Sequence, residues 1–221
     1  AETDEGELAE LMVGRNVQLV VDRGESHPGE ATFVVSDLLT VDDRGHETVK
    51  GVTFEVRAGE IFGIAGVAGN GQEELVEALT GLRAPTAGRV TLDGLDVTGD
   101  GPRALQRAGM SFVPGDRHRF GLILPFTLQD NLVLAQYDEA PFARGLWRND
   151  SAIEAWAEQA IAQYDIRTPS VTVGMATLSG GNQQKVVLGK WLCLEPKLLL
   201  LDEPTRGIDV GAKEEIYKLI D

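Results

Sequence analysis

The sequence predicts an α/β fold with a mainly parallel core sheet, an N-terminal antiparallel β-subdomain and an inserted helical subdomain. Residues 31–57 alternate apolar and polar side chains around a turn at 42–45, a pattern typical of antiparallel strands. Short apolar runs and helical patterns then alternate, which is the order that builds a parallel sheet. In the middle of the chain, apolar residues recur at helical spacing instead, and this change of period predicts the helical insertion.

Composition limits the classes of protein that the chain can belong to. With 221 residues, 43% of them hydrophobic, the chain suits one compact domain, or one domain with a small subdomain. The net charge of −15 excludes the basic surface that a nucleic-acid-binding protein needs. The single Cys193 excludes an internal disulfide and fits a reducing compartment. Cys193 lies in a helical stretch, so we expect a buried structural thiol.

The two ends of the sequence predict a piece of a longer polypeptide. Residues 1–16 read as a linker, and their first ten positions carry acidic side chains without a basic one. Residues 17–221 form the expected domain, which is cut at its C-terminus because Asp221 falls inside a continuing helical pattern. The sequence contains neither a secretory signal nor an apolar run of about 18 residues, so we expect a cytosolic or peripheral protein.

The elements of the first half follow in order after the antiparallel strands. Glu60–Ala65 is expected to be a buried strand, and a helix with an apolar face follows from Gln72 to Gly81. Gly88–Asp93 and Gly109–Val113 read as two further strands, separated by a short helix that Pro102 begins.

The second half opens with the helical subdomain, which we place at about residues 121–178. Thr127 caps one expected helix, and Ser151–Tyr164 has the spacing of another. A long helix then starts at Ser179, followed by the apolar strand Lys197–Leu201 and a last helix from Gly211.

A glycine-rich loop joins the expected strand Glu60–Ala65 to the next helix. Successive glycines turn backbone N–H groups into one concavity at a helix N-terminus, where a phosphate can bind. In the Walker A pattern, Lys and then Ser or Thr would end this loop and hold the phosphates and Mg²⁺. Gln72 and Glu73 stand there instead, and both changes disfavour a triphosphate. A glycine-rich turn without a ligand would share this pattern. The candidate residues are Gly66, Gly69, Asn70, Gly71, Gln72 and Glu73.

Two carboxylates follow the apolar strand near the end of the chain. In this Walker B arrangement, Asp202 would hold Mg²⁺ through water, with Glu73 as a weak second ligand. Glu203 would orient or deprotonate an attacking water, although the incomplete loop leaves it idle. An ordinary strand that ends in acidic loop residues is the alternative.

The third motif, Leu178-Ser179-Gly180-Gly181-Asn182-Gln183, opens a long helix just before this strand. Ser179 fits the N-cap, and the two glycines permit close approach of a phosphate to the helix N-terminus. A capped helix start without a ligand is the plainer interpretation, but the Walker B strand that follows makes the combination specific.

With these motifs the chain resembles the nucleotide-binding domain of ATP-binding-cassette transporters, a P-loop NTPase fold, over residues 31–221. Within that family it is similar to the second of two cassettes fused in one subunit of bacterial importers of simple sugars and nucleosides. The segments that carry this resemblance are Leu8–Arg15, Gly66–Glu73, Pro114–Leu122, Ser179–Lys185 and Pro204–Lys213.

The resemblance implies that two ATP molecules bind between head-to-tail cassettes. Ser179, Gly180, Gly181 and Gln183 would contact ATP held by the N-terminal cassette of the same chain, and Asp209 would cross the same interface as the D-loop residue. This cassette's own site would bind ATP and Mg²⁺ weakly or not at all. Gly115 stands where the family has its Q-loop glutamine, and His118 beside it reads as a surface or docking residue rather than a catalyst.

The function expected from this resemblance is that of an ATPase subunit that powers import of a monosaccharide. The partners would be membrane permease subunits and, indirectly, a periplasmic or lipoprotein binding protein, with the subunit on the cytoplasmic face of the membrane and no nucleic acid involved. The isolated piece should be nearly inactive. A nucleoside importer is the main alternative, and a soluble regulatory, DNA-acting or ribosome-acting cassette is a third. The expected permease contact consists of apolar residues near the Pro114–Leu122 turn, namely Phe120, Leu122, Ile123 and Phe126. The alternative is that these side chains close the core beneath the helical insertion.

Overall fold

The structure is a computed structural model that describes residues 27–220, and these divide into two compact units. One unit ends at Ser111 and the other begins at Phe112. The predicted linker at residues 1–16 lies outside the described residues.

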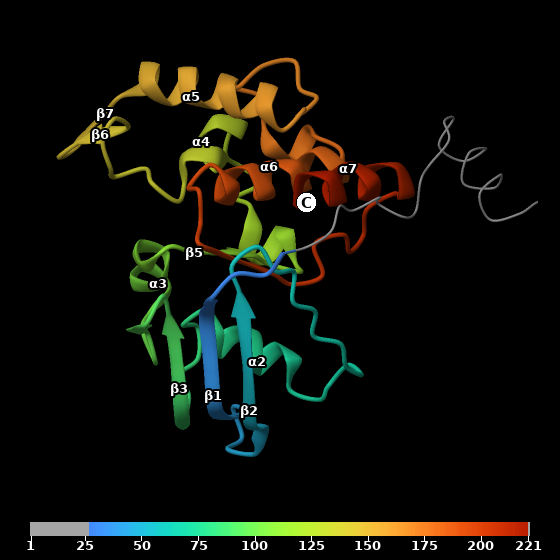
Figure 1. The fold of residues 1–221 in the computed structure, drawn as a ribbon. Helices are drawn as coiled ribbons and strands as arrows, with labels where there is room; N and C mark the ends of the chain where they lie inside the picture. The colour runs from blue at the N-terminus through green and yellow to red at the C-terminus, as the bar shows by residue number, and fades with distance from the viewer. Residues whose placement is uncertain (1–26, 221) are drawn as a thin grey trace, which may run out of the picture. The chain divides into compact units, whose positions relative to one another are not determined.

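The first unit contains a four-stranded sheet in the order β2-β1-β3-β4, and each pair in it is antiparallel. Its strands are β1 (Ala31–Val41), β2 (Glu47–Arg57), β3 (Ala87–Leu92) and β4 (Leu95–Asp96). Helix α2 (Gln72–Leu79) lies against β1 and β2 (Figure 1). The predicted antiparallel subdomain is therefore confirmed.

Local chemistry explains the turn and the register of this sheet. The Asp42 carboxylate accepts N–H bonds from Arg44 and His46, both at 2.8 Å, and so closes the turn between β1 and β2. In β1, Phe33 and Val35 are buried, and the buried phase then shifts to Leu38 and Thr40. The shift follows Asp37, whose φ of 48° interrupts the pairing with β2.

The prediction of a buried strand at Glu60–Ala65 is wrong. Residues 60–66 form no strand, and Ile61 and Ile64 are about half exposed. Phe62 stacks on Phe54 of β2 with ring centroids 5.1 Å apart, so the segment is anchored by a ring rather than by a ladder of hydrogen bonds. An apolar run can be read from the sequence, but a strand also needs a paired neighbour, and that pairing is a long-range contact.

The second unit is mainly helical. Strand β5 (Met110–Val113) crosses the boundary after Ser111 and pairs with β8 (Leu198–Leu201). Helix α3 (Pro102–Ala108), which precedes β5, belongs to the first unit. The remaining elements are η1 (Arg117–Gly121), α4 (Leu128–Val133), β6 (Ala143–Arg144), β7 (Trp147–Arg148), α5 (Asp150–Gln163), η2 (Met175–Thr177), α6 (Gly180–Leu192) and α7 (Val210–Ile220). Both predicted caps are present, since the Thr127 hydroxyl accepts from Asp130 N and the Ser179 hydroxyl from Asn182 N.

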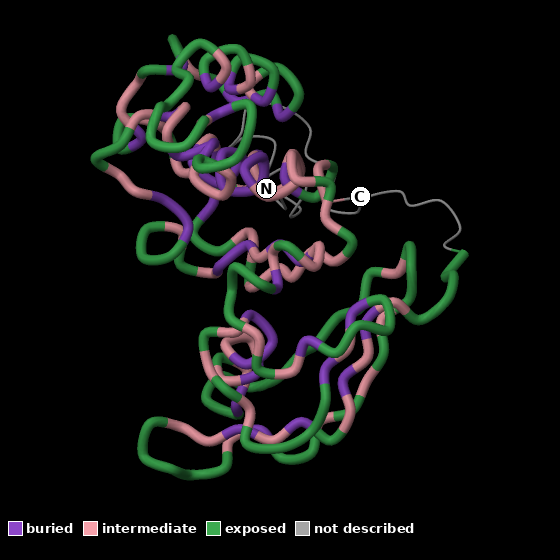
Figure 2. Tube along the Cα trace, turned by 90° about the vertical axis from the view of Figure 1, so that its left-hand side faces the viewer, coloured by how far each residue is buried: buried purple, intermediate pink, exposed green. Residues whose placement is uncertain are grey.

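Helix α6 is the centre of this unit's core. Its residues Val186, Val187 and Leu188 are fully buried. In space, α6 packs against α4 and α7 (Figure 1). In Figure 2, buried residues (purple) occur in this helical unit and also in the first unit. The side chains of the cluster include Leu128, Leu132, Ala157, Ala160, Met175 and Ile216.

The prediction that the subdomain at about residues 121–178 is all helical is wrong at residues 143–148. β6 and β7 form a short antiparallel hairpin, with Ala143 opposite Arg148 and Arg144 opposite Trp147. Gly145 in its two-residue loop has a φ of +64°, which such tight hairpin turns require. Among residues 27–220, no helix is long and apolar enough to cross a membrane.

Candidate nucleotide-contacting site

Two residues of the glycine-rich loop have left-handed backbone conformations. Gly69 and Gly71 have φ values of +88° and +93°, which favour glycine over other residues. Gly71 directly precedes α2, and a Cβ on it would lie 2.5 Å from the carbonyl oxygen of Thr48. Neighbouring β-structure therefore also requires glycine at this position.

The side chain of Gln72 is folded onto this loop. Its Oε1 accepts the N–H of Asn70 at 3.0 Å, and its Nε2 donates to the Val67 carbonyl oxygen at 2.8 Å. A Cβ on Gly66 would clash with the same Nε2. One loop N–H that a phosphate would use is thus bonded to the chain's own carboxamide.

The start of α2 also has unfavourable charge for a triphosphate. Glu73 and Glu74 occupy its first turn, and a helix N-terminus with two carboxylates repels anions at short range. With Gln72 in place of a lysine, residues 66–73 offer a triphosphate no cationic side chain, and the weak binding of ATP–Mg²⁺ expected here stays a prediction.

The Walker B residues lie where the sequence predicts, at the end of β8. The backbone N–H of Asp202 donates to the Val113 carbonyl oxygen at 2.9 Å, which fixes the strand end beside β5. Oδ2 of Asp202 accepts the N–H of Gly115 at 3.3 Å. A Cβ on Gly115 would lie 2.9 Å from that oxygen, so glycine at this position permits the close approach.

Glu203 has an ion-pair partner of its own. Its φ is 41°, in the left-handed region, and its Oε2 lies 3.2 Å from Nη1 of Arg206. Both side chains are more than 60% exposed, so this pair contributes little to stability. Within residues 27–220, no group of three or more His, Cys, Asp or Glu side chains gathers in a way that could hold a metal ion. The metal role of Asp202 and Glu73 stays a prediction.

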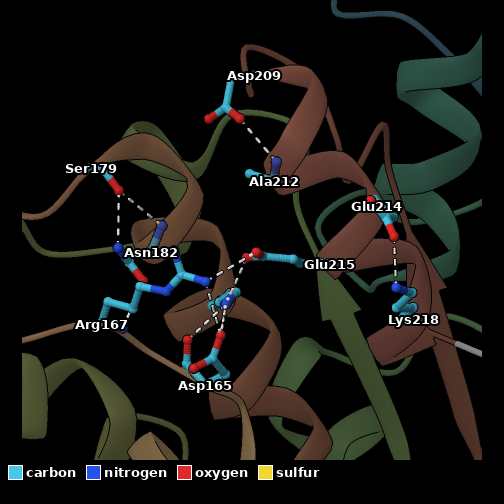
Figure 3. A network of polar contacts seen from close by, with 10 residues as sticks. Asp165, Arg167, Ser179, Asn182, Asp209, Ala212, Glu214, Glu215 and Lys218 are labelled. Atoms are coloured by element: carbon cyan, nitrogen blue, oxygen red, sulfur yellow. Dashed lines mark hydrogen bonds and ion pairs between the residues drawn. The ribbon is translucent and has the colours of Figure 1, made fainter. Parts of the chain in front are cut away.

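The signature motif and the D-loop residue are brought together. Oγ of Ser179 accepts from Asn182 Nδ2 at 3.0 Å, and Oδ1 of Asn182 accepts the N–H of Arg167 at 2.8 Å (Figure 3). A Cβ on Gly181 would lie 2.8 Å from Cβ of Ala212 and 4.0 Å from Oδ2 of Asp209. The close packing of α6 against the start of α7 therefore needs the second glycine.

Asp209 also caps the helix that follows it. Its Oδ1 accepts the N–H of Ala212 at 2.9 Å (Figure 3). Ser179 is exposed, and Gly180 is half-buried. Gly181 and Gln183 are buried, and the Gln183 side chain, only 6% exposed, has its amide bonded within the protein.

Sequence reasoning missed the contacts of the turn at η1. Asp116 caps η1, and backbone N–H groups of Arg119 and His118 hold the pKa of its carboxyl below the ordinary value. Arg117 and His118 both reach Gln183, as described in detail below. The run of three basic residues was visible in the sequence, but its partner 65 positions away was not.

Two other expectations about side chains can be compared with the structure. Phe120 and Phe126 are 57% and 45% exposed, whereas Leu122 is buried at 6%, so Leu122 cannot belong to an exposed contact surface. Cys193 lies 3.7 Å from the hydroxyl oxygen of Tyr164, and burial raises the pKa of its thiol. It is a half-buried structural residue, as expected.

Comparison with known proteins shows the family to which this chain is similar. A family model described as ABC transporter matches residues 49–206. The ribose import ATP-binding protein RbsA of Chromobacterium violaceum is 43% identical over 221 residues, covering 100% of this chain and 42% of that protein. The guanosine import ATP-binding protein NupO of Bacillus subtilis is 41% identical over 217 residues, covering 98% of this chain and 42% of that protein.

The solved structures agree on the fold. A nucleotide-free ATP-binding cassette from an ABC transporter superposes with a TM-score of 0.72 at 20% identity, over 86% of this chain and 76% of that one. The chain spans less than half the length of the curated relatives described above. The match to the family model covers most of the chain, and the fold agrees. This chain therefore belongs to the ABC transporter family, as an ATPase domain.

Proposed function

We propose that this chain is the second cassette of a fused importer ATPase, and that it contributes its signature helix to ATP bound by the first cassette. The single observation that carries this proposal is the contrast between the two motifs. The loop at Gly66–Glu73 uses its own Gln72 to satisfy a backbone N–H, whereas the helix start at Ser179–Gly181 keeps an exposed cap. One motif lacks the chemistry for a phosphate and the other retains it.

The proposal assigns unequal roles to the carboxylates and the signature helix. Glu203 and Asp202 serve this cassette's own weak site, and Glu203 is paired with Arg206. Ser179, Gly180 and Gly181 serve the partner cassette's ATP, with Asp209 beside them. Turnover in the whole subunit then depends on the signature helix more than on Glu203.

The transported substrate is proposed to be a monosaccharide. The 43% identity to a ribose import protein supports this class. A nucleoside is the second candidate, because a guanosine import protein is nearly as similar, at 41%. The substrate-binding residues belong to other subunits in either case, so the relatives' names carry this choice.

The proposed partners are the first cassette, permease subunits in the membrane and a substrate-binding protein outside it. The subunit would work at the cytoplasmic face of the membrane. Phe120 and Phe126 are the exposed apolar side chains near the η1 turn that a permease helix would cover.

The test compares two variants in the complete transporter. Ser179→Arg should lower ATP hydrolysis and uptake by at least about a hundredfold, because a bulky cation would displace the helix start from the nucleotide. Glu203→Gln should leave most of the turnover. Steady-state hydrolysis and uptake of a labelled monosaccharide and a labelled nucleoside would be measured together. Equal damage from both variants would contradict the proposed division of roles.

A further inference from the structure

The buried side chain of Gln183, on the signature helix α6, forms hydrogen bonds to residues of two other segments. It lies one turn after Ser179 on α6 and is 6% exposed. Its Nε2 donates to the Met175 carbonyl oxygen at 3.3 Å, which turns Oε1 toward the η1 turn. There Oε1 accepts from Nε of Arg117 at 3.3 Å and lies 2.9 Å from Nε2 of His118.

This arrangement fixes the hydrogen on the His118 ring. A carboxamide oxygen can only accept, so Nε2 of His118 must carry the proton that it shares with Gln183. Two donors from consecutive residues thus converge on one buried acceptor. An unpaired buried amide oxygen would be unfavourable, so both donors contribute to holding the amide in this orientation.

Arg117 makes further contacts at the start of the same helix. Its Nη1 donates to the Arg206 carbonyl oxygen at 3.2 Å, in the turn after the Walker B strand. A Cβ on Gly180 would lie 3.1 Å from its Nη2, so the guanidinium lies directly against the first residue of α6. One side chain therefore contacts both the helix start and the Arg206 turn.

The η1 turn that carries these two residues is itself held in place. Asp116 accepts from the backbone N–H groups of His118 and Arg119 at 3.0 and 3.1 Å. At the other end of η1, Nζ of the buried Lys190 donates to the Gly121 carbonyl oxygen at 2.6 Å. Helix α6 is consequently joined to η1 at Gln183 and again at Lys190, about two turns further along.

We propose that Arg117 and His118 are positioning residues that set the first turn of the signature helix through Gln183. This inference rests on the proposed function, in which Ser179–Gly181 contacts ATP on the other cassette. Neither residue needs to touch the nucleotide. Their donors fix the amide of Gln183, and the Arg117 guanidinium fixes Gly180 relative to the Arg206 turn.

The expected kinetic effect differs from that of a residue that binds ATP. The other cassette supplies most of the contacts to ATP, so loss of positioning should leave KM for ATP within about twofold. If the helix start is displaced by a fraction of an ångström, kcat should fall by about tenfold or more, because small misplacements of catalytic groups have large effects on the rate. The predicted signature is a change in kcat at nearly constant KM.

The experiment uses the complete two-cassette transporter and four variants, measured beside the Ser179→Arg variant that tests the proposed function. Arg117→Gln removes the forked donor, and His118→Leu removes the ring donor. His118→Gln restores an N–H near the position of Nε2 and should recover most of the lost kcat. Arg144→Gln is the matched control, since Arg144 is an exposed cation of the β6–β7 hairpin outside the proposed site.

The results separate this inference from the proposed function. If Ser179→Arg abolishes turnover while Arg117→Gln and His118→Leu keep the wild-type kcat, the positioning role is refuted and the proposed function stands. If Ser179→Arg itself keeps turnover, the proposed function fails. Equal kcat for His118→Leu and His118→Gln would also overturn the inference, because a role in filling space would not require the donor. A larger change in KM than in kcat would refute it as well.

Discussion

Replacing Lys185 by methionine should destabilise the helical unit, because this lysine is a buried cation with all its donors used. Its side chain is 3% exposed. Its Nζ lies 2.7 Å from the Asp165 carbonyl oxygen, 3.0 Å from Oδ2 of Asp165 and 2.9 Å from Oε2 of Glu215 (Figure 3). An ammonium group has three donors, and three acceptors are present. The network joins α6 to α7 and to Asp165, two residues after the end of α5.

The magnitude follows from what the variant leaves behind. Removal of one partner of a buried pair costs roughly 3–5 kcal/mol when the remaining charge is uncompensated. Here Arg167 remains within 3.3 Å of Glu215, and the side chain of Asp165 is 69% exposed and can hydrate. We therefore expect a cost at or below the lower limit of that range, about 2–3 kcal/mol. Asp165→Asn, at the exposed end, should cost about 1 kcal/mol or less.

The assay is urea unfolding at neutral pH followed by tryptophan fluorescence. All three tryptophans of the chain, Trp147, Trp156 and Trp191, belong to the helical unit, so the signal reports on that unit. The double variant Lys185→Met with Glu215→Leu should be less unstable than Lys185→Met alone, because it removes the unpaired carboxylate. A cost below about 1 kcal/mol for Lys185→Met, or equal costs for Lys185→Met and Asp165→Asn, would refute the reasoning.

Two further predictions concern charge. Burial lowers the pKa of Lys190 from 10.5 to about 8, so between these pH values the unfolded chain binds a proton that the folded chain has lost. The free energy of unfolding of the wild type should therefore rise through this pH window relative to that of Lys190→Met, by at most about 3 kcal/mol. The same fluorescence assay at several pH values measures this difference, and parallel pH profiles for the two proteins would contradict the prediction. Separately, Gln72→Lys with Glu73→Ser should increase affinity for ATP–Mg²⁺ in calorimetric titration, because the first change adds a cation and frees the N–H of Asn70. Identical affinities in the wild type and the double variant would count against that explanation.

Much of the architecture could be predicted because it depends on local chemistry. Asp42 closes a turn, Pro102 begins α3, and Thr127 and Ser179 cap the two helices that were expected to start there. Each of these assignments needs only the few residues around it. The order of the three motifs was likewise sufficient to indicate the family.

The expectations that were wrong depend on distant parts of the chain. The apolar run Ile61–Ala65 lacks a paired strand, and Leu122 is buried rather than exposed. The hairpin β6–β7 needed Gly145 in the left-handed region within a segment of helical pattern. In each case a single residue pattern is compatible with more than one environment, and packing decides between them.

The sequence by itself determined the family, most of the elements and the chemical nature of each motif, including the missing lysine of the phosphate loop. Only the tertiary structure decided how these residues are used. It turned Gln72 back onto its own loop, directed Gln183 inward, and placed Arg117 against Gly180 from 63 positions away in the chain. The physical reason is that side-chain hydrogen bonds between distant segments depend on the packed backbone, which no local pattern of residues specifies.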